Sequence, residues 1–242
     1  MALGCFMRLS GMIEACAIMM RMKKKFLLVL ALCAALSSFA DKRKTVLLLG
    51  DSIRMGYAPH VREMMKAEAD VVFPKGNCMF AYYTLRMIWE WTKLVEDPKS
   101  VDVVHFNNGL WDLGQRDGRD CLTPVDVYAP TIRRIAEELR HFFPNARLVF
   151  ATTTPINEAV YCEQHTKGNA EVERYNAAAL AALAGKVDAI NDMYSFVREN
   201  NVGRHYKDIV HFDDKGYSML AGQVVKSIRA VSAKGISGNL SP

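Results

Sequence analysis

The feature that most limits the fold of this chain is a regular alternation of short apolar segments with longer segments of helical periodicity. Five segments have the composition of buried strands: residues 45–50, 69–74, 101–106, 146–155 and 187–191. Helices are expected at residues 58–68, 82–95, 124–143, 169–184 and 214–231, with Pro130 near the effective start of the third. Strands separated by helices of this length form parallel sheets covered on both faces. The sequence therefore predicts an α/β fold, a three-layer α/β/α sandwich around a five-stranded parallel sheet.

The first forty residues have a different character from the rest. Three lysines at 23–25 precede an apolar run at 26–36, and small residues close the segment at 38–40. This is the pattern of an export signal, and the run is too short for a comfortable permanent membrane span. We predict that residues 1–40 direct export to the periplasm or the medium, with residues 1–21 an upstream extension of a start at Met22. Residues 41–242 are then one domain with no stable membrane span, and a buried helix is the alternative for the leader.

The charge balance and the cysteines exclude several classes of function. After the leader, 26 basic residues face 25 acidic ones, so the body lacks the basic patch of a nucleic-acid-binding protein. Three cysteines remain there, Cys78, Cys121 and Cys162, which allow at most one disulfide. None has C-x-x-C spacing, so we predict no zinc site.

The strongest chemical signal lies at the end of the first expected strand. Ser52 follows "TVLLLGD" at the edge of the sheet where open α/β proteins bind ligands. A serine hydroxyl needs an adjacent base to act as a nucleophile. Asp208 and His211 stand three residues apart just before the last expected helix. If the fold brings them to Ser52, Asp208 can orient His211, and His211 can accept the serine proton.

At these residues the chain resembles the SGNH or GDSL hydrolases. "GDSIRMGY" is similar to the family's first block, and "DIVH" is similar to its last block, D-x-x-H. The resemblance extends from Val46 to the last helix. It implies a flavodoxin-like sheet and a serine hydrolase of ester bonds, with Ser52, His211 and Asp208 as its catalytic triad. It also implies that no metal or organic cofactor is required.

The family's oxyanion hole is matched less closely. The resemblance implies Gly76 as the backbone donor after the second strand, with Asn77 as a further donor. In the third block, "HFNNGLWDL", Trp111 stands where the family's G-x-N-D motif has its asparagine. We expect the amide of Asn107 to take that role, with Asn108 or Asn77 as substitutes.

The substrate remains open between several classes. An exported, nearly neutral esterase resembles the family's carbohydrate acetyl esterases, so we expect a small-molecule or polysaccharide ester as substrate. The alternatives are a lipid-directed esterase, lysophospholipase or thioesterase, and a carbohydrate-binding protein that has lost catalysis. Arg54 follows Ser52 closely, and we expect it either to contact an anionic group of the substrate or to form a surface salt bridge.

Overall fold

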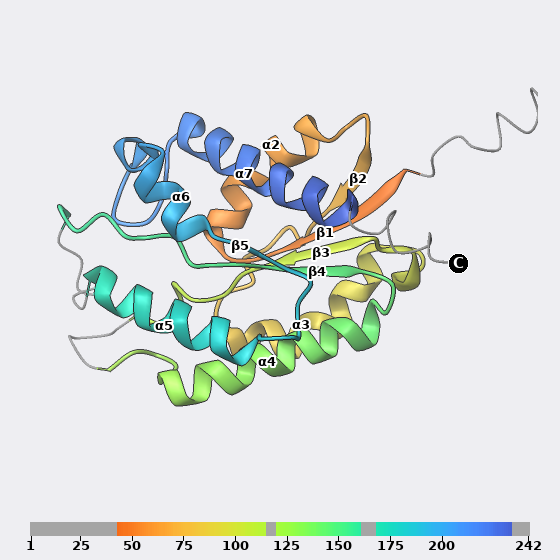
Figure 1. Ribbon diagram of the computed structural model, residues 1–242, viewed down its shortest axis with the longest axis horizontal. Coiled ribbons are helices and arrows are strands. Elements are labelled where there is room, and N and C mark those ends of the chain that lie inside the picture. Colours follow the sequence, from red (N-terminus) through yellow and green to blue (C-terminus); the bar gives the residue numbers. More distant parts are fainter. Residues whose placement is uncertain (1–42, 115–119, 161–167, 234–242) are drawn as a thin grey trace, which may run out of the picture. The chain divides into compact units, whose positions relative to one another are not determined.

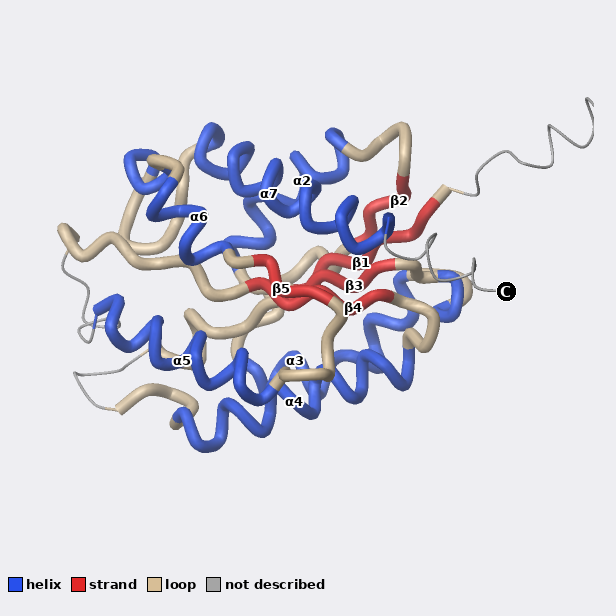
Figure 2. The backbone as a smooth tube through the Cα atoms, viewed as in Figure 1, coloured by secondary structure: helices blue, strands red, loops and turns tan. Residues whose placement is uncertain are grey.

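The computed structural model describes residues 43–114, 120–160 and 168–233; the expected leader and Cys162 lie outside them. Five parallel strands form one sheet in the order β2-β1-β3-β4-β5 (Figure 2). Their bounds are Lys44–Leu49 for β1, Ala69–Val72 for β2, Val103–Phe106 for β3, Arg147–Ala151 for β4 and Ala189–Asn191 for β5. This is the flavodoxin-like order of doubly wound sheets, so the expected fold class is confirmed.

The apolar segments become the centre of the sheet because both of its faces are covered. All four residues of β3 are buried, as are the last four of β1 and of β4. In the register of β1 with β3, Leu49 lies opposite Phe106. The two strands therefore end side by side, and the chain segments that follow them begin at the same edge of the sheet.

Helices form the two outer layers (Figure 1). One face is covered by α2 (Ser52–Met64), α6 (Met193–Glu199) and α7 (Asp214–Ala233). The opposite face is covered by α3 (Ala81–Trp91), α4 (Val125–Phe142) and α5 (Gly168–Ala182). Helices α2 and α7 pack very closely: a Cβ atom on Gly56 would lie 2.1 Å from the ring of Tyr217. Within the described residues, no helix is long and apolar enough to span a membrane.

Several helix boundaries differ from those expected. Helix α2 begins at Ser52 rather than at residue 58, because the Asp51 carboxylate accepts the Ile53 N–H and caps the helix. Helix α4 begins at Val125, so Pro130 lies inside it and not at its start. Pro130 is exposed, so water can reach the carbonyl that its missing N–H leaves unbonded.

Two further differences lie on the C-terminal side of the sheet. Strand β4 ends at Ala151 rather than at residue 155, because its partner β5 ends at Asn191, which pairs with Ala151. The short helix α6 was not expected. It begins where the Asp192 carboxylate accepts the Ser195 N–H, an N-cap that the sequence shows only as an aspartate three residues before a serine.

Candidate active site

Ser52 is the first residue of helix α2 and comes three residues after the end of β1. The Asp51 side chain that caps this helix is buried, and burial raises the pKa of its carboxyl. Backbone N–H groups at a helix N-terminus carry a partial positive charge. Ser52 thus stands, half-buried, where the backbone favours a developing negative charge.

Ser52, His211 and Asp208 form one hydrogen-bonded row. The distance from Ser52 Oγ to His211 Nε2 is 2.8 Å, and the distance from His211 Nδ1 to Asp208 Oδ2 is also 2.8 Å. Asp208 and His211 lie on the loop that connects a short 3-10 helix, Val202–His205, to α7. This loop brings His211 to Ser52, which is 159 positions earlier in the sequence. Ser52 and the pair that was expected to serve it therefore meet.

The backbone around Asp208 orients its carboxylate. Asp208 Oδ1 accepts the N–H groups of Val210, at 2.9 Å, and His211, at 2.7 Å. Burial raises the pKa of Asp208, but these hydrogen bonds and the His211 ring outweigh it, so the pKa lies below its ordinary value. Asp208 is therefore ionised at neutral pH and faces the His211 ring nitrogen.

Arg54 does not have either of the expected roles. Its side chain is 2% exposed, so it is neither a surface salt bridge nor a contact for a substrate anion. The guanidinium donates to the carbonyls of Gly50 and Pro74, and also to the Gly76 carbonyl at 2.5 Å. Arg54 thereby ties the loop after β2, which carries Gly76, to the turn that carries Ser52. The Gly76 residue itself is exposed, and a Cβ atom there would meet nothing within 4 Å.

The three candidate asparagines have different surroundings. Asn107 is half-buried beside the turn, since a Cβ on Gly50 would lie 3.8 Å from Asn107 Cβ. Its amide nitrogen donates one hydrogen to Ala151 O at 2.8 Å, which leaves the second hydrogen of the NH₂ group. Asn77 is also half-buried, and its Oδ1 accepts the Met79 N–H.

Asn108 is held inside the protein. It is 0% exposed, and its amide nitrogen donates to the Met79 carbonyl and to Thr84 Oγ1. Its own carbonyl accepts the hydroxyl of Tyr128 at 2.8 Å. These contacts join the loop after β3 to the loop before α3 and to α4. The geometry therefore favours Asn107 over Asn108 as a group that reaches a substrate.

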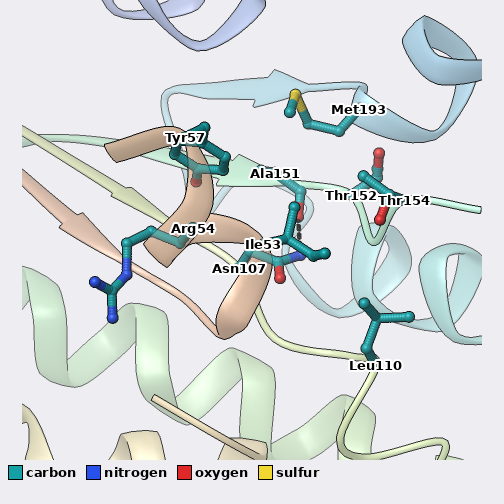
Figure 3. Close-up of a pocket in the computed structure, with 9 residues that line it drawn as sticks. All are labelled: Ile53, Arg54, Tyr57, Asn107, Leu110, Ala151, Thr152, Thr154 and Met193. Atoms are coloured by element: carbon teal, nitrogen blue, oxygen red, sulfur yellow. Dashed lines mark hydrogen bonds between the residues drawn. The ribbon is translucent and has the colours of Figure 1, made fainter. Parts of the chain in front are cut away.

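A small cavity lies behind Asn107 (Figure 3). Its volume is about 10 Å³, enough for one water-sized group. Its walls come from α2, the segment after β3, the end of β4 with the segment that follows it, and the start of α6. Its lining residues are Ile53, Arg54, Tyr57, Asn107, Leu110, Ala151, Thr152, Thr154 and Met193. Thr154 Oγ1 is buried with no hydrogen-bond partner within the described residues. The cavity is therefore partly polar and too small for a long acyl chain.

Asp112 and Trp111 end the third-block loop in opposite environments. Asp112 is fully buried, and both of its carboxylate oxygens accept the Ala81 N–H at the start of α3. Burial raises the pKa of Asp112 to about 7. Trp111 stands in place of the family's asparagine and has no side-chain amide. It is 41% exposed, so it lies partly on the surface.

Two of the three cysteines of the body, Cys78 and Cys121, lie within the described residues. Cys78 is fully buried and its Sγ contacts Arg54 Nη2 at 3.6 Å, while Cys121 Sγ donates to Glu171 Oε1 at 3.2 Å. Within residues 43–114, 120–160 and 168–233, no group of three or more His, Cys, Asp or Glu side chains is arranged to hold a metal ion. The expected chemistry of Ser52 needs none.

The comparisons with known proteins agree on the fold. No protein-family model matches the sequence, and no curated protein matches it. Among solved structures, an acetyl xylan esterase superposes with a TM-score of 0.59 at 18% identity, over 76% of this chain and 99% of that one. A GDSL-like lipase from Bacteroides thetaiotaomicron superposes with a TM-score of 0.60 at 20% identity, over 84% and 94%. A carbohydrate esterase family 3 protein from Talaromyces cellulolyticus gives 0.58 at 18%, over 79% and 99%.

The fold is that of the SGNH/GDSL hydrolases. At these identities the likeness concerns the fold alone, and the arrangement of Ser52, His211 and Asp208 is an independent observation. Within this SGNH fold, sequence reasoning missed two features of the site. The burial of Arg54 had no local signal, because a charged residue on a helix is usually solvated. The cavity at Thr154 depends on four segments distant in the sequence and has no signal in any one of them.

Proposed function

We propose that this protein is a serine hydrolase of ester bonds. The observation that carries the proposal is the hydrogen-bonded row from Ser52 through His211 to Asp208. A base within hydrogen-bond reach of a hydroxyl, itself oriented by a third group, is the arrangement that activates a serine nucleophile. The row lies at the carboxyl edge of the parallel sheet, where ligands of such folds bind.

In the proposed reaction Ser52 Oγ attacks the ester carbonyl while His211 Nε2 takes the hydroxyl proton. Asp208 stabilises the imidazolium that results and holds the tautomer in which Nδ1 carries a proton. The tetrahedral intermediate then collapses as His211 returns the proton to the leaving alcohol. Water then attacks the acyl-enzyme while His211 takes its proton. His211 returns that proton to Ser52 Oγ as the carboxylic acid leaves.

Three donors are proposed for the oxyanion: the Ser52 N–H, the Gly76 N–H and the Asn107 amide. The first stands at the positive end of α2, and the third retains a hydrogen that its bond to Ala151 does not use. Arg54 supports the second, because it binds the Gly76 carbonyl. Loss of one oxyanion donor typically raises the barrier by about 3 kcal/mol.

We further propose a short acyl group, with a carbohydrate acetyl ester as the substrate. The cavity beside Asn107, about 10 Å³ in volume, would accommodate an acetyl methyl, which supports a short acyl group. Two of the structural neighbours are described as an acetyl xylan esterase and a carbohydrate esterase, which supports the same class. Export by the leader would bring the enzyme to a polysaccharide, and the N-terminal residue of the mature extracellular protein tests that part of the proposal.

The decisive experiment compares wild type with Ser52→Ala on p-nitrophenyl acetate, p-nitrophenyl octanoate and acetylated xylan. We expect serine-dependent acetate release and little turnover of the octanoate. Preference for the octanoate would favour a lipid-directed esterase. Equal rates for wild type and Ser52→Ala would refute the triad and favour a binding protein that has lost catalysis.

A matched pair of aspartate variants tests the role of the row itself. We expect Asp208→Asn to fold normally and to lower kcat on the order of 10⁴-fold, because it leaves His211 in the wrong tautomer. Asp213→Asn is the control, since Asp213 Oδ2 pairs with His205 Nδ1 at 3.0 Å without touching Ser52. It should keep the wild-type turnover. Wild-type kcat in Asp208→Asn would remove Asp208 from the mechanism.

A further inference from the structure

A second depression lies beside the loop that carries Asp208 and His211. Its volume is about 370 Å³, within the range of roughly 300–1,000 Å³ for ligand pockets. The loop after β4, the start of α5, helix α6 and the 3-10 helix Val202–His205 form its walls. We call it the arginine groove and define it by Ile156, Glu158, Val197, Arg198, Arg204 and Tyr206.

The arginine groove adjoins the loop that carries Asp208 and His211. Tyr206 pairs in an antiparallel bridge with Phe212, the residue after His211, and the two rings stack 4.5 Å apart. Residues opposite each other in such a bridge have Cα atoms about 4.5–5.5 Å apart. Between the lining residues Ile156 and Glu158, the Asn157 N–H donates to Ile209 O at 2.7 Å. The groove therefore adjoins the loop that carries His211, and a polymeric substrate bound at both sites would cross this loop.

The charges of the groove leave one cation unpaired. Arg198 Nη1 bonds the Tyr194 hydroxyl at 3.0 Å and Glu173 Oε1 at 3.3 Å. The Glu158 carboxylate accepts the Asn169 N–H at 2.8 Å; this hydrogen bond lowers the pKa of Glu158, so the group stays ionised. Within the described part of the chain, the exposed Arg204 side chain forms no hydrogen bond or ion pair.

We propose that the arginine groove binds a carboxylate-bearing sugar unit of the acetylated polysaccharide, with Arg204 pairing with the carboxylate. A guanidinium binds carboxylates through two parallel N–H donors, which suits it to this role better than an ammonium. The half-buried Tyr206 offers its ring to a sugar ring, while the exposed Asn201 offers an amide to the sugar hydroxyls. The polar and charged walls favour a sugar over the alkyl part of an anionic lipid. The inference rests on the proposed esterase function.

The test measures selectivity between acidic and neutral polymers. The purified protein is assayed on acetylated polygalacturonate and on acetylated glucomannan, and the ratio of the two kcat/KM values is compared with that of Arg204→Gln. We expect the ratio to fall about tenfold or more, through KM, because a charge-assisted pair is lost. Added salt should lower the wild-type ratio as well. Arg133→Gln is the control: this exposed arginine on α4 does not line the groove, and its loss should leave the ratio unchanged.

A binding measurement separates failure of this inference from failure of the esterase proposal. Calorimetric titration of trigalacturonate into Ser52→Ala requires no turnover, and we expect binding that Arg204→Gln abolishes. An unchanged selectivity ratio in Arg204→Gln would overturn the inference. So would absence of trigalacturonate binding, or Arg204-dependent binding of phosphatidylglycerol vesicles in its place. If trigalacturonate binds while no variant releases acetate, the groove stands and the esterase proposal fails.

Discussion

Replacement of Arg54 by methionine tests whether a buried cation organises the candidate active site. Methionine keeps an unbranched side chain of similar length but removes every donor. The carbonyl of Gly50 keeps its bond from the Cys78 N–H, and the exposed Gly76 can be hydrated, so the buried Pro74 carbonyl suffers most. Leaving a buried acceptor unpaired costs about 1–3 kcal/mol, and each lost hydrogen bond to a charged group about 1.5–3 kcal/mol.

These losses are offset in part because the cation no longer has to be desolvated. We therefore expect Arg54→Met to lower the free energy of unfolding by about 3 kcal/mol and the Tm by roughly 6–12 °C for a chain of this size. Urea denaturation followed by circular dichroism measures the first quantity. Because the Gly76 loop loses its anchor, kcat for p-nitrophenyl acetate should fall by about 10–100-fold per folded molecule.

The control is Arg62→Met on the same helix. Arg62 is exposed, donates to Val71 O at 3.0 Å and lies 4.0 Å from the centre of the Phe73 ring. Its loss should cost about 1 kcal/mol or less. If Arg54→Met unfolds at the wild-type urea concentration, the energetic reasoning is wrong. If it is destabilised but each folded molecule keeps the wild-type kcat, Arg54 stabilises the loop without positioning Gly76 for catalysis.

Three further predictions concern separate parts of the molecule. Asn107→Ala should lower kcat by about 10²-fold at a nearly unchanged Tm. Asn108→Ala should instead lower the Tm more than it lowers kcat, because its buried hydrogen bonds are lost. The reverse pattern would move the oxyanion role to Asn108. Burial lowers the pKa of His105 from 6.5 to about 4, so between these pH values the unfolded chain binds a proton that the folded chain does not. The free energy of unfolding should therefore fall by about 3 kcal/mol as the pH drops from 6.5 to 4. His105→Gln should flatten this slope in urea titrations at each pH. Gly56→Ala should destabilise the protein by about 1–3 kcal/mol through collision with Tyr217, and a wild-type midpoint would show that α2 and α7 can separate at little cost.

The oxyanion groups show where sequence reasoning reached its limit. Asn107 and Asn108 are adjacent and chemically identical, so the sequence could name both without choosing between them. The structure separates them because consecutive residues after β3 point in different directions, one beside the Gly50 turn and one between α3 and α4. The glycine that follows is also explained only in three dimensions, since a Cβ on Gly109 would lie 2.0 Å from Thr153 Oγ1.

The sequence by itself determined the fold class and the three residues of the hydrogen-bonded row. Hydrophobic periodicity reports local burial, and strands that alternate with helices admit few topologies, all of which bring strand ends to one edge of the sheet. Only the tertiary structure decided that Arg54 is buried and which asparagine borders the Gly-Asp-Ser turn. It also decided that a groove with an unpaired arginine adjoins the loop that carries His211. The physical reason is that the burial and hydrogen-bond partners of a side chain depend on segments distant in the sequence, and local pattern carries no record of them.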